Sequence, residues 1–270
     1  MSSPDFQIFT SLRYDPALLQ VHSSPDFAHA SWNHGHSSPL YMLDFHRDRL
    51  LRAAHHWKWD SAINVLAGDA GLQLLADTIT AHLAEKDRPA RVRVDIFRDG
   101  KLTVMAAPTP PVPLTRLFPT TLDPPALDSY SGTVFEVVVD TTHNVNPSEF
   151  THYKTSQRQV YDQARQQAGI TAPTIPREVL IVDSKDKSVM EGSISTPYFC
   201  RGGRWVTPFV NKETDIEWRG GQDGTTRRWA LERGLAVEEV VMTQSLVDGE
   251  ECWLSTGVRG FIFGRVKLNP

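Results

Sequence analysis

Residues 178–193, EVLIVDSKDKSVMEGS, are predicted to form a strand, a polar turn and a second strand. Short apolar runs separated by a cluster of Asp, Ser and Lys are typical of neighbouring strands in a sheet. The second run ends at Glu191, which precedes the small residues Gly192 and Ser193. A carboxylate in this place has room to lie against a flat ring. The simpler alternative is a glutamate exposed in a turn.

The regions on both sides of this stretch mix helices with strands. Residues 90–108 contain two alternating runs joined by Asp99-Gly100, a strong signal for a β-hairpin. Apolar spacing predicts helices over 41–57 and 71–86. Further strands are predicted over 6–14, 132–140, 197–208, 236–243 and 252–266, and a further helix over 224–235. This order, without repeats, predicts the α+β class.

The distribution of prolines predicts two domains. Residues 108–125 contain seven prolines, which suits an interdomain connection. We therefore predict a smaller N-terminal domain over 1–107, a proline-rich linker over 108–125 and a larger C-terminal domain over 126–270.

The composition excludes several classes of protein. Hydrophobic residues make up 40% of the chain, charged residues 22%, and the net charge is -4, so no basic surface for nucleic acid is expected. No apolar run has the length of a membrane span, and the N-terminus lacks the features of a secretory signal. Two cysteines are too few for a disulfide framework, and the ten histidines are not spaced as metal ligands. We therefore expect a cytoplasmic protein without a metal. It also lacks the GxGxxG and P-loop motifs.

A lysine precedes a predicted helix in residues 150–169, FTHYKTSQRQVYDQARQQAG. Two hydroxyl residues are suited to cap this helix, Thr155 and Ser156. Its apolar residues recur at helical spacing: Val160, Ala164 and Ala168. Lys154 lies just before the cap, where it is either a solvated lysine or a Schiff-base lysine for a pyridoxal phosphate cofactor. The second role requires an acid for the pyridine nitrogen and a cradle for the phosphate.

The sequence offers candidates for these companions. Glu191 is the candidate acid. Gly224 precedes Thr225 and Thr226 at the start of a helix, whose N-terminal amides would face a phosphate. Arg49 would supply a fixed positive charge. A second turn with hydroxyls and free amides contains Ser255, Thr256 and Gly257.

Together and in this order, these motifs resemble the class IV aminotransferase family, which comprises pyridoxal phosphate enzymes of fold type IV. The resemblance covers essentially the whole chain. It rests on an arginine helix (HRDRL, 46–50), a lysine (Lys154), EGS at 191–193, GTTR at 224–227 and STGVRG at 255–260.

The resemblance implies roles for these residues. Lys154 would be the catalytic residue, forming the Schiff base and moving protons at the substrate carbon. Glu191 would pair with the pyridine nitrogen. The phosphate would be held by Arg49, Thr225, Thr226, Ser255 and Thr256. The family architecture also implies a cofactor, pyridoxal 5'-phosphate (PLP), between two domains, and a homodimer.

The chain departs from the family pattern at several positions. Thr225 replaces an isoleucine, Thr256 replaces an asparagine, and Thr196 lies where asparagine is common. A tyrosine usually follows the lysine by several residues. Arg158 falls near that position here, and Tyr161 lies further on, so we assign Tyr161 no role.

Within the family the chain is most similar to fungal-type 4-amino-4-deoxychorismate lyases. That likeness implies release of pyruvate and 4-aminobenzoate for folate synthesis. Alternatives are a branched-chain, D-amino-acid or R-selective amine aminotransferase, or a protein that has the fold without catalysis. The substrate is a dianion, so basic groups are expected near it. Arg93 and Arg158 rank ahead of Arg13 and Arg219, and a hydroxyl on the first strand, Thr10 or Ser11, would also reach the site.

Overall fold

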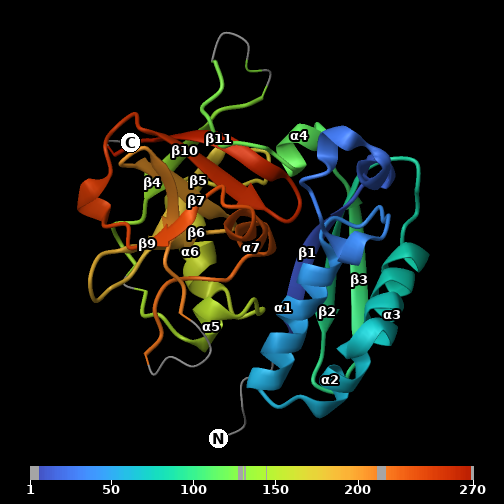
Figure 1. Ribbon diagram of the computed structural model, residues 1–270. Helices are drawn as coiled ribbons and strands as arrows, with labels where there is room; N and C mark the ends of the chain where they lie inside the picture. The colour runs from blue at the N-terminus through green and yellow to red at the C-terminus, as the bar shows by residue number, and fades with distance from the viewer. Residues whose placement is uncertain (1–5, 127–129, 131, 144, 212–216, 269–270) are drawn as a thin grey trace, which may run out of the picture. The chain divides into compact units, whose positions relative to one another are not determined.

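The chain forms two compact units, shown together in Figure 1. The computed structural model describes residues 6–126, 130, 132–143, 145–211 and 217–268. Unit 1 comprises Met1–Phe118, Tyr153–Gln157 and Gly257–Arg259. Unit 2 comprises Pro119–His152, Arg158–Thr256 and Gly260–Pro270. Unit 1 is therefore assembled from three separate segments of the chain.

Unit 1 contains a three-stranded antiparallel sheet in the order β1 (Ile8–Tyr14), β2 (Ala90–Ile96) and β3 (Leu102–Pro108) among its described residues. The helices α1 (Leu43–His56), α2 (Asp60–Leu66) and α3 (Gly68–Ala81) pack against one another, and α1 packs on β1 (Figure 1). In β2 the alternate residues Val92, Val94 and Ile96 are fully buried, whereas β1 is buried at six of its seven positions and β3 at none. The predicted strands and helices of this half are confirmed.

Unit 2 is built on an eight-stranded sheet, counted over the described residues. Its order is β6-β5-β4-β11-β10-β7-β8-β9. These strands are β4 (Phe135–Val139), β5 (Arg177–Val182), β6 (Val189–Gly192), β7 (Thr196–Arg201), β8 (Arg204–Pro208), β9 (Val237–Glu239), β10 (Glu251–Thr256) and β11 (Gly260–Val266). β4 is parallel to both of its neighbours, and the other pairs except β8 with β9 are antiparallel. The predicted hairpin over 178–193 is β5 and β6.

Side-chain alternation gives this sheet two apolar faces. Val137 and Leu180 belong to one buried cluster, whereas their neighbours Val138 and Ile181 belong to another. The second cluster includes residues of α6 (Gln159–Gln167), so α6 covers that face. A strand buried on both faces reads as a continuous apolar run, which explains the composition of the opening stretch.

The remaining elements are short. They are η1 (Pro16–Ser23), η2 (Pro25–Phe27), η3 (Asn33–Gly35), α4 (Leu114–Leu117), α5 (Glu149–His152), α7 (Thr225–Glu232) and η5 (Thr243–Ser245). No helix in the described part of the chain has the length and apolarity needed to cross a bilayer. The mixture of helices and strands confirms the predicted α+β class.

The helix expected to begin at Lys154 begins later. The segment 154–156 is extended because its backbone bonds to the edge of β1, and α6 starts at Gln159 with Arg158 as its N-cap. Thr155 and Ser156 therefore do not cap it. The predicted apolar face is also wrong at Val160, which is 38% exposed.

The predicted linker 108–125 contains ordered, packed chain. The helix α4 lies within it, and its apolar residues are buried: Leu117, Phe118 and Leu122. The chain passes from unit 1 to unit 2 between Phe118 and Pro119, inside the predicted linker. The two short segments 153–157 and 257–259 group with unit 1, whereas the sequence interpretation placed them in the C-terminal domain.

A buried ion pair joins parts of unit 1. Arg13 is fully buried, and its Nη2 lies 2.7 Å from Asp15 Oδ2. The same guanidinium donates to the carbonyl oxygens of Pro110 (3.0 Å) and Val258 (3.4 Å). Arg13 thus connects three segments that are distant in the sequence. Its contacts are structural, which removes it from the candidates for binding a substrate carboxylate.

We expect Arg13→Met to lower the free energy of unfolding by about 3 kcal/mol, because it leaves the Asp15 carboxylate buried without its cation. The measurement is urea-induced unfolding followed by circular dichroism. Arg88→Met is the matched control in the same unit, since the Arg88–Glu85 pair is more than half exposed. Equal midpoints for the two variants would contradict the structural role of Arg13.

Candidate active site

Lys154 is held in unit 1 by backbone pairing with β1. The amide of Phe9 donates to the carbonyl oxygen of Lys154 (2.9 Å), and the amide of Ser156 donates to that of Gln7 (2.9 Å). The Ser156 hydroxyl in turn accepts from the amide of Gln7 (3.0 Å). Tyr153, before the lysine, is buried. The backbone on both sides of Lys154 is therefore fixed, while its side chain is half-buried.

A buried polar cluster lies between β1 and α1. Arg49 Nη2 donates a short hydrogen bond to the hydroxyl of Thr10. Thr10 Oγ1 lies 2.6 Å from His46 Nδ1. Since the hydroxyl oxygen already accepts from Arg49, its proton is available for His46 Nδ1, which then acts as an acceptor. Burial lowers the pKa of His46 well below 6.5, and the charges of Arg49 and Lys154 lower it further. His46 is therefore neutral, and the cluster keeps the positive charge of Arg49.

Two cations flank one aromatic ring in unit 1. The guanidinium carbon of Arg93 lies 3.9 Å from the ring centroid of Phe9, and Lys154 Nζ lies 5.0 Å from it. Arg93 also bonds Asp95 through Nε (3.0 Å) and Nη2 (2.5 Å). The ring and the carboxylate together fix the guanidinium of Arg93.

The turn after β10 approaches this cluster closely. A Cβ added to Gly257 would lie 2.7 Å from His46 Cε1 and 2.9 Å from the carbonyl oxygen of Ser11. The amide of Arg13 donates to the carbonyl oxygen of Gly257 (2.9 Å). Only glycine fits here, which gives a physical reason for the glycine in the STGVRG motif.

In unit 2, the predicted acid Glu191 is bonded to a tyrosine of α6. The hydroxyl of Tyr161 donates to Glu191 Oε1 at 2.6 Å, and both residues are buried. The sequence interpretation assigned Tyr161 no role because its spacing from Lys154 differs from the family pattern. The helical phase of α6 would have found it, since Tyr161 and Ala164 form the buried face of this helix.

A second carboxylate fixes the loop that follows Glu191. Glu178 is 2% exposed and accepts hydrogen bonds from the hydroxyls of Ser193 and Ser195 and from the amides of Val179, Ser193 and Ile194. Arg158 Nη2 donates to the carbonyl oxygen of Ser193 (2.7 Å). Arg158 therefore contacts this loop and stacks on the Tyr161 ring at 4.9 Å.

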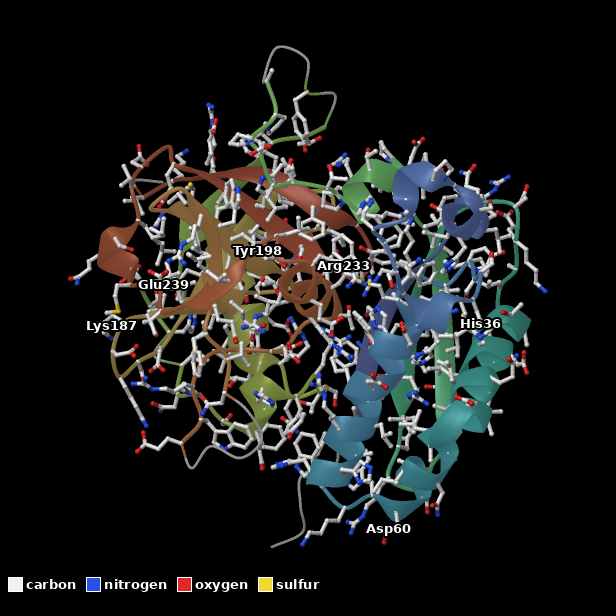
Figure 2. All side chains as sticks on the ribbon, viewed as in Figure 1. His36, Asp60, Lys187, Tyr198, Arg233 and Glu239 are labelled. Atoms are coloured by element: carbon white, nitrogen blue, oxygen red, sulfur yellow. The ribbon has the colours of Figure 1, made fainter. Side chains whose placement is uncertain are left out.

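A set of hydroxyls meets at the start of α7. Ser255 Oγ lies 2.9 Å from Thr226 Oγ1 and 2.9 Å from the hydroxyl of Tyr198, and all three side chains are buried. Burial raises the pKa of Tyr198, so this phenol stays protonated. Tyr198 is labelled within unit 2 in Figure 2. The N-cap of α7 is Gly224, which has no side chain to cap the first amides of the helix.

The predicted site residues thus fall into two groups. Lys154, Arg49, Thr10 and Arg93 gather around β1 in unit 1. The others lie in unit 2: Glu191, Arg158, Thr225, Thr226, Ser255 and Thr256. Within that unit Thr226 and Ser255 are in contact, and Arg158 lies beside the tyrosine that bonds Glu191. Arg219 is set apart, exposed and 3.8 Å from Asp186.

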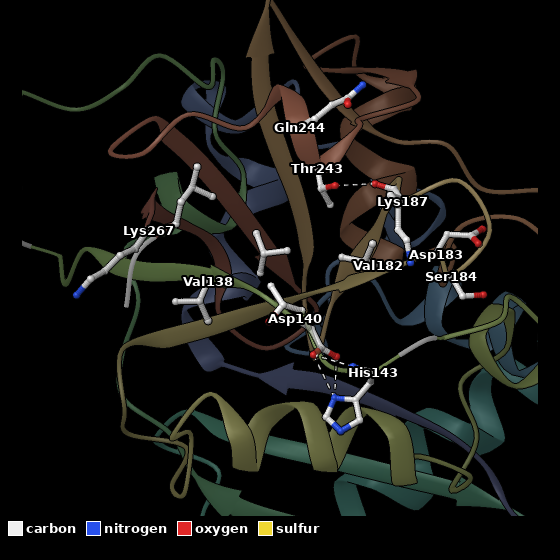
Figure 3. Close-up of a pocket in the computed structure, with 13 residues that line it drawn as sticks. Val138, Asp140, His143, Val182, Asp183, Ser184, Lys187, Thr243, Gln244 and Lys267 are labelled. Carbon is white, nitrogen blue, oxygen red and sulfur yellow. Dashed lines mark hydrogen bonds and ion pairs between the residues drawn. The ribbon is translucent and has the colours of Figure 1, made fainter.

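A pocket of about 540 Å³ lies elsewhere in unit 2 (Figure 3). Its polar lining includes Asp140, whose carboxylate accepts from the His143 ring and from the amides of Thr142 and His143. None of the predicted site residues is among the described residues that line it. Because the carboxylates of Asp140 and Asp183 in its lining already accept hydrogen bonds from nearby groups, this pocket is a poor candidate for the reactive centre.

Comparison with known proteins identifies the family. Residues 29–265 match the family Amino-transferase class IV. The chain belongs to this family. The resemblance inferred from the sequence motifs is thereby confirmed.

One curated relative is aminodeoxychorismate lyase from Saccharomyces cerevisiae, 28% identical over 202 residues. The match covers 66% of this chain and 51% of the yeast protein, so the chain spans about half the length of that relative.

Solved structures share the fold. A provisionally assigned amino-acid aminotransferase from Mesorhizobium loti is 21% identical, with a TM-score of 0.66 over 97% of this chain and 100% of that chain. The branched-chain amino acid aminotransferase from Escherichia coli is 15% identical, with a TM-score of 0.58 over 97% and 77%. The 4-amino-4-deoxychorismate lyase from Pseudomonas aeruginosa is 17% identical, with a TM-score of 0.57 over 96% and 82%. The predicted fold type IV is confirmed.

The low pKa of His46 predicts a pH dependence of stability. The unfolded histidine binds a proton below pH 6.5, whereas the folded one does not, so stability is lost as the pH falls below 6.5. His46→Gln removes this proton uptake. The free energy of unfolding should then fall less steeply with falling pH, by up to about 1.4 kcal/mol per pH unit. Urea unfolding of both proteins between pH 5 and pH 8 tests it. Parallel curves would show that folding does not lower the pKa of His46.

Proposed function

We propose that this chain is a PLP-dependent enzyme that uses the residues described above. The chemistry of the donors fits the cofactor. An arginine and a lysine supply positive charge in unit 1, while buried hydroxyls and the uncapped start of α7 supply the donors that a phosphate requires. The buried carboxylate of Glu191 suits a protonated ring nitrogen.

Each residue then has a defined task. Lys154 would bind the cofactor and move protons at the substrate carbon. Glu191 would hold the pyridine nitrogen in its protonated form. Arg49, Thr225, Thr226, Ser255 and Thr256 would bind the phosphate. When bound, PLP supplies an electron-accepting ring. The proposal requires residues of both units.

Among the reactions of the family we favour the 4-amino-4-deoxychorismate lyase reaction. The observation that carries this choice is the 28% identity to the yeast aminodeoxychorismate lyase. In this reaction a ring proton is removed, the enolpyruvyl group leaves as pyruvate, and the remaining ring becomes aromatic as 4-aminobenzoate. Aromaticity supplies the driving force. The product would serve folate synthesis.

The substrate carries two carboxylates, and three residues are proposed to contact it. Arg93 is fixed by Phe9 and Asp95, and Thr10 lies on the same strand as Phe9. Arg158 is the candidate in unit 2. An arginine presents five N–H donors, so those that bond Asp95 or Ser193 leave others for a carboxylate.

We also propose that the enzyme acts as a homodimer in the cytoplasm, as the family resemblance and the composition imply. An aminotransferase acting on branched-chain, D-amino-acid or amine substrates is the second candidate, supported by the fold shared with the Escherichia coli enzyme. The two candidates differ in one requirement, because a transamination needs a keto-acid acceptor and the lyase reaction does not. A protein with the fold but no catalysis would bind no PLP.

The decisive assay supplies enzymatically generated aminodeoxychorismate to the purified protein with PLP. Pyruvate release is followed with lactate dehydrogenase and NADH. We expect pyruvate and 4-aminobenzoate in equal amounts without any added keto acid. Lys154→Ala should lower the rate by at least about a thousandfold, because it removes the group that moves the proton.

Two results would redirect the assignment. Turnover that depends on a keto acid would favour the aminotransferase. A wild-type protein that stays colourless after incubation with PLP would overturn the proposal as a whole.

A further inference from the structure

The hydrogen bond between Tyr161 and Glu191 gives the tyrosine a role beyond packing. Tyr161 is 3% exposed, and its hydroxyl donates to Glu191 Oε1 at 2.6 Å. Gln222 hydrogen-bonds the same tyrosine, and Arg158 stacks on its ring at 4.9 Å. A residue used only for packing would not need these polar contacts, since phenylalanine would fill the same volume.

The carboxylate is also confined from another side. A Cβ added to Gly221 would lie 2.4 Å from Glu191 Cδ, 2.5 Å from Cγ and 2.6 Å from Oε1. The backbone of Gly221 thus leaves room for this carboxylate and for nothing larger. The carboxylate is held by a tyrosine hydroxyl at Oε1 and by a main chain that passes close to it.

The tyrosine acts as a permanent donor. Burial raises its pKa well above 10, and the Glu191 charge raises it further, so the hydroxyl keeps its proton at neutral pH. A hydrogen bond donated to a carboxylate favours the ionised form of that carboxylate. The two oxygens of a carboxylate offer about four lone-pair sites, so a carboxylate can accept from more than one donor.

We infer that Tyr161 is a positioning residue for Glu191: it orients the carboxylate and keeps it ionised, so that Glu191 can accept the N–H of a protonated ring nitrogen. This inference rests on the proposed PLP function and specifies how this chain controls the protonation of the cofactor ring. Gly221 serves the same end by leaving room for the carboxylate. Tyr161 itself need not touch the cofactor.

The test uses the full-length protein reconstituted with PLP labelled with ¹⁵N in the ring. The ¹⁵N chemical shift reports directly whether the ring nitrogen is protonated, and absorbance titration gives the dissociation constant for PLP. The variants are Tyr161→Phe, which removes one hydroxyl, and Gly221→Ala, which displaces the carboxylate while leaving Tyr161 in place. Tyr41→Phe is the matched control, because Tyr41 is equally buried and its hydroxyl donates to a carbonyl oxygen at the same 2.6 Å, in unit 1.

We expect both test variants to move the ¹⁵N resonance toward the unprotonated value and to weaken PLP binding roughly tenfold, the effect of losing one hydrogen bond to a charged group. Tyr41→Phe should change neither quantity. In a Glu191→Gln background, Tyr161→Phe should change PLP binding by less than about twofold, since the two residues act through one contact.

Other outcomes are equally informative. If Tyr161→Phe and Gly221→Ala lower stability but leave the ¹⁵N shift at the wild-type value, Tyr161 is structural and the inference fails while the proposed function stands. If the wild-type protein binds no PLP, the proposed function and the inference fail together. If only Tyr161→Phe fails to fold, Gly221→Ala decides between these cases.

Discussion

The outer edge of β1 is the constraint on which unit 1 depends. One edge of this strand pairs with β2, and the other carries backbone donors and acceptors that need partners. Those partners come from distant segments. At one end of the strand, Lys154 accepts from the amide of Phe9 and the amide of Ser156 donates to Gln7. Near the other end, Gly257 accepts from the amide of Arg13. The need to satisfy one strand edge thus brings a lysine and a glycine turn, about a hundred residues apart in the chain, to the same strand.

The two units stabilise their buried charged groups in different ways. Unit 1 collects cationic side chains around Thr10 and keeps its buried histidine neutral, which limits their mutual repulsion. Among the carboxylates that unit 2 buries, Glu178 accepts hydrogen bonds from the loop that follows β6, and Glu191 accepts one from Tyr161. Buried charge is tolerated in both units because hydrogen bonds replace the lost water.

The strands, the hairpins and the long helices were predictable from the sequence because they rest on periodicity and on turn residues such as Asp99-Gly100. Arg49, Thr10 and Lys154 all lie at β1 or contact it, and their role as a site stays a proposal. The conformation at Lys154 was not predictable locally, because capping residues and helical spacing favoured a helix and a tertiary strand edge overrode them. The contact of Tyr161 with Glu191 was not expected because the family spacing pointed to another position, and the ion pair of Arg13 is visible only in three dimensions.

Unit 1 is discontinuous in the chain, and this has a consequence for synthesis. A chain made from its N-terminus completes β1, β2 and β3 well before residues 153–157 exist, and the contact with Gly257 becomes possible later still. During that interval an unpaired strand edge is exposed to other chains. The nascent protein is therefore most vulnerable to aggregation before its last crossing segment is made, and its first-made unit is completed only after most of the second has been translated.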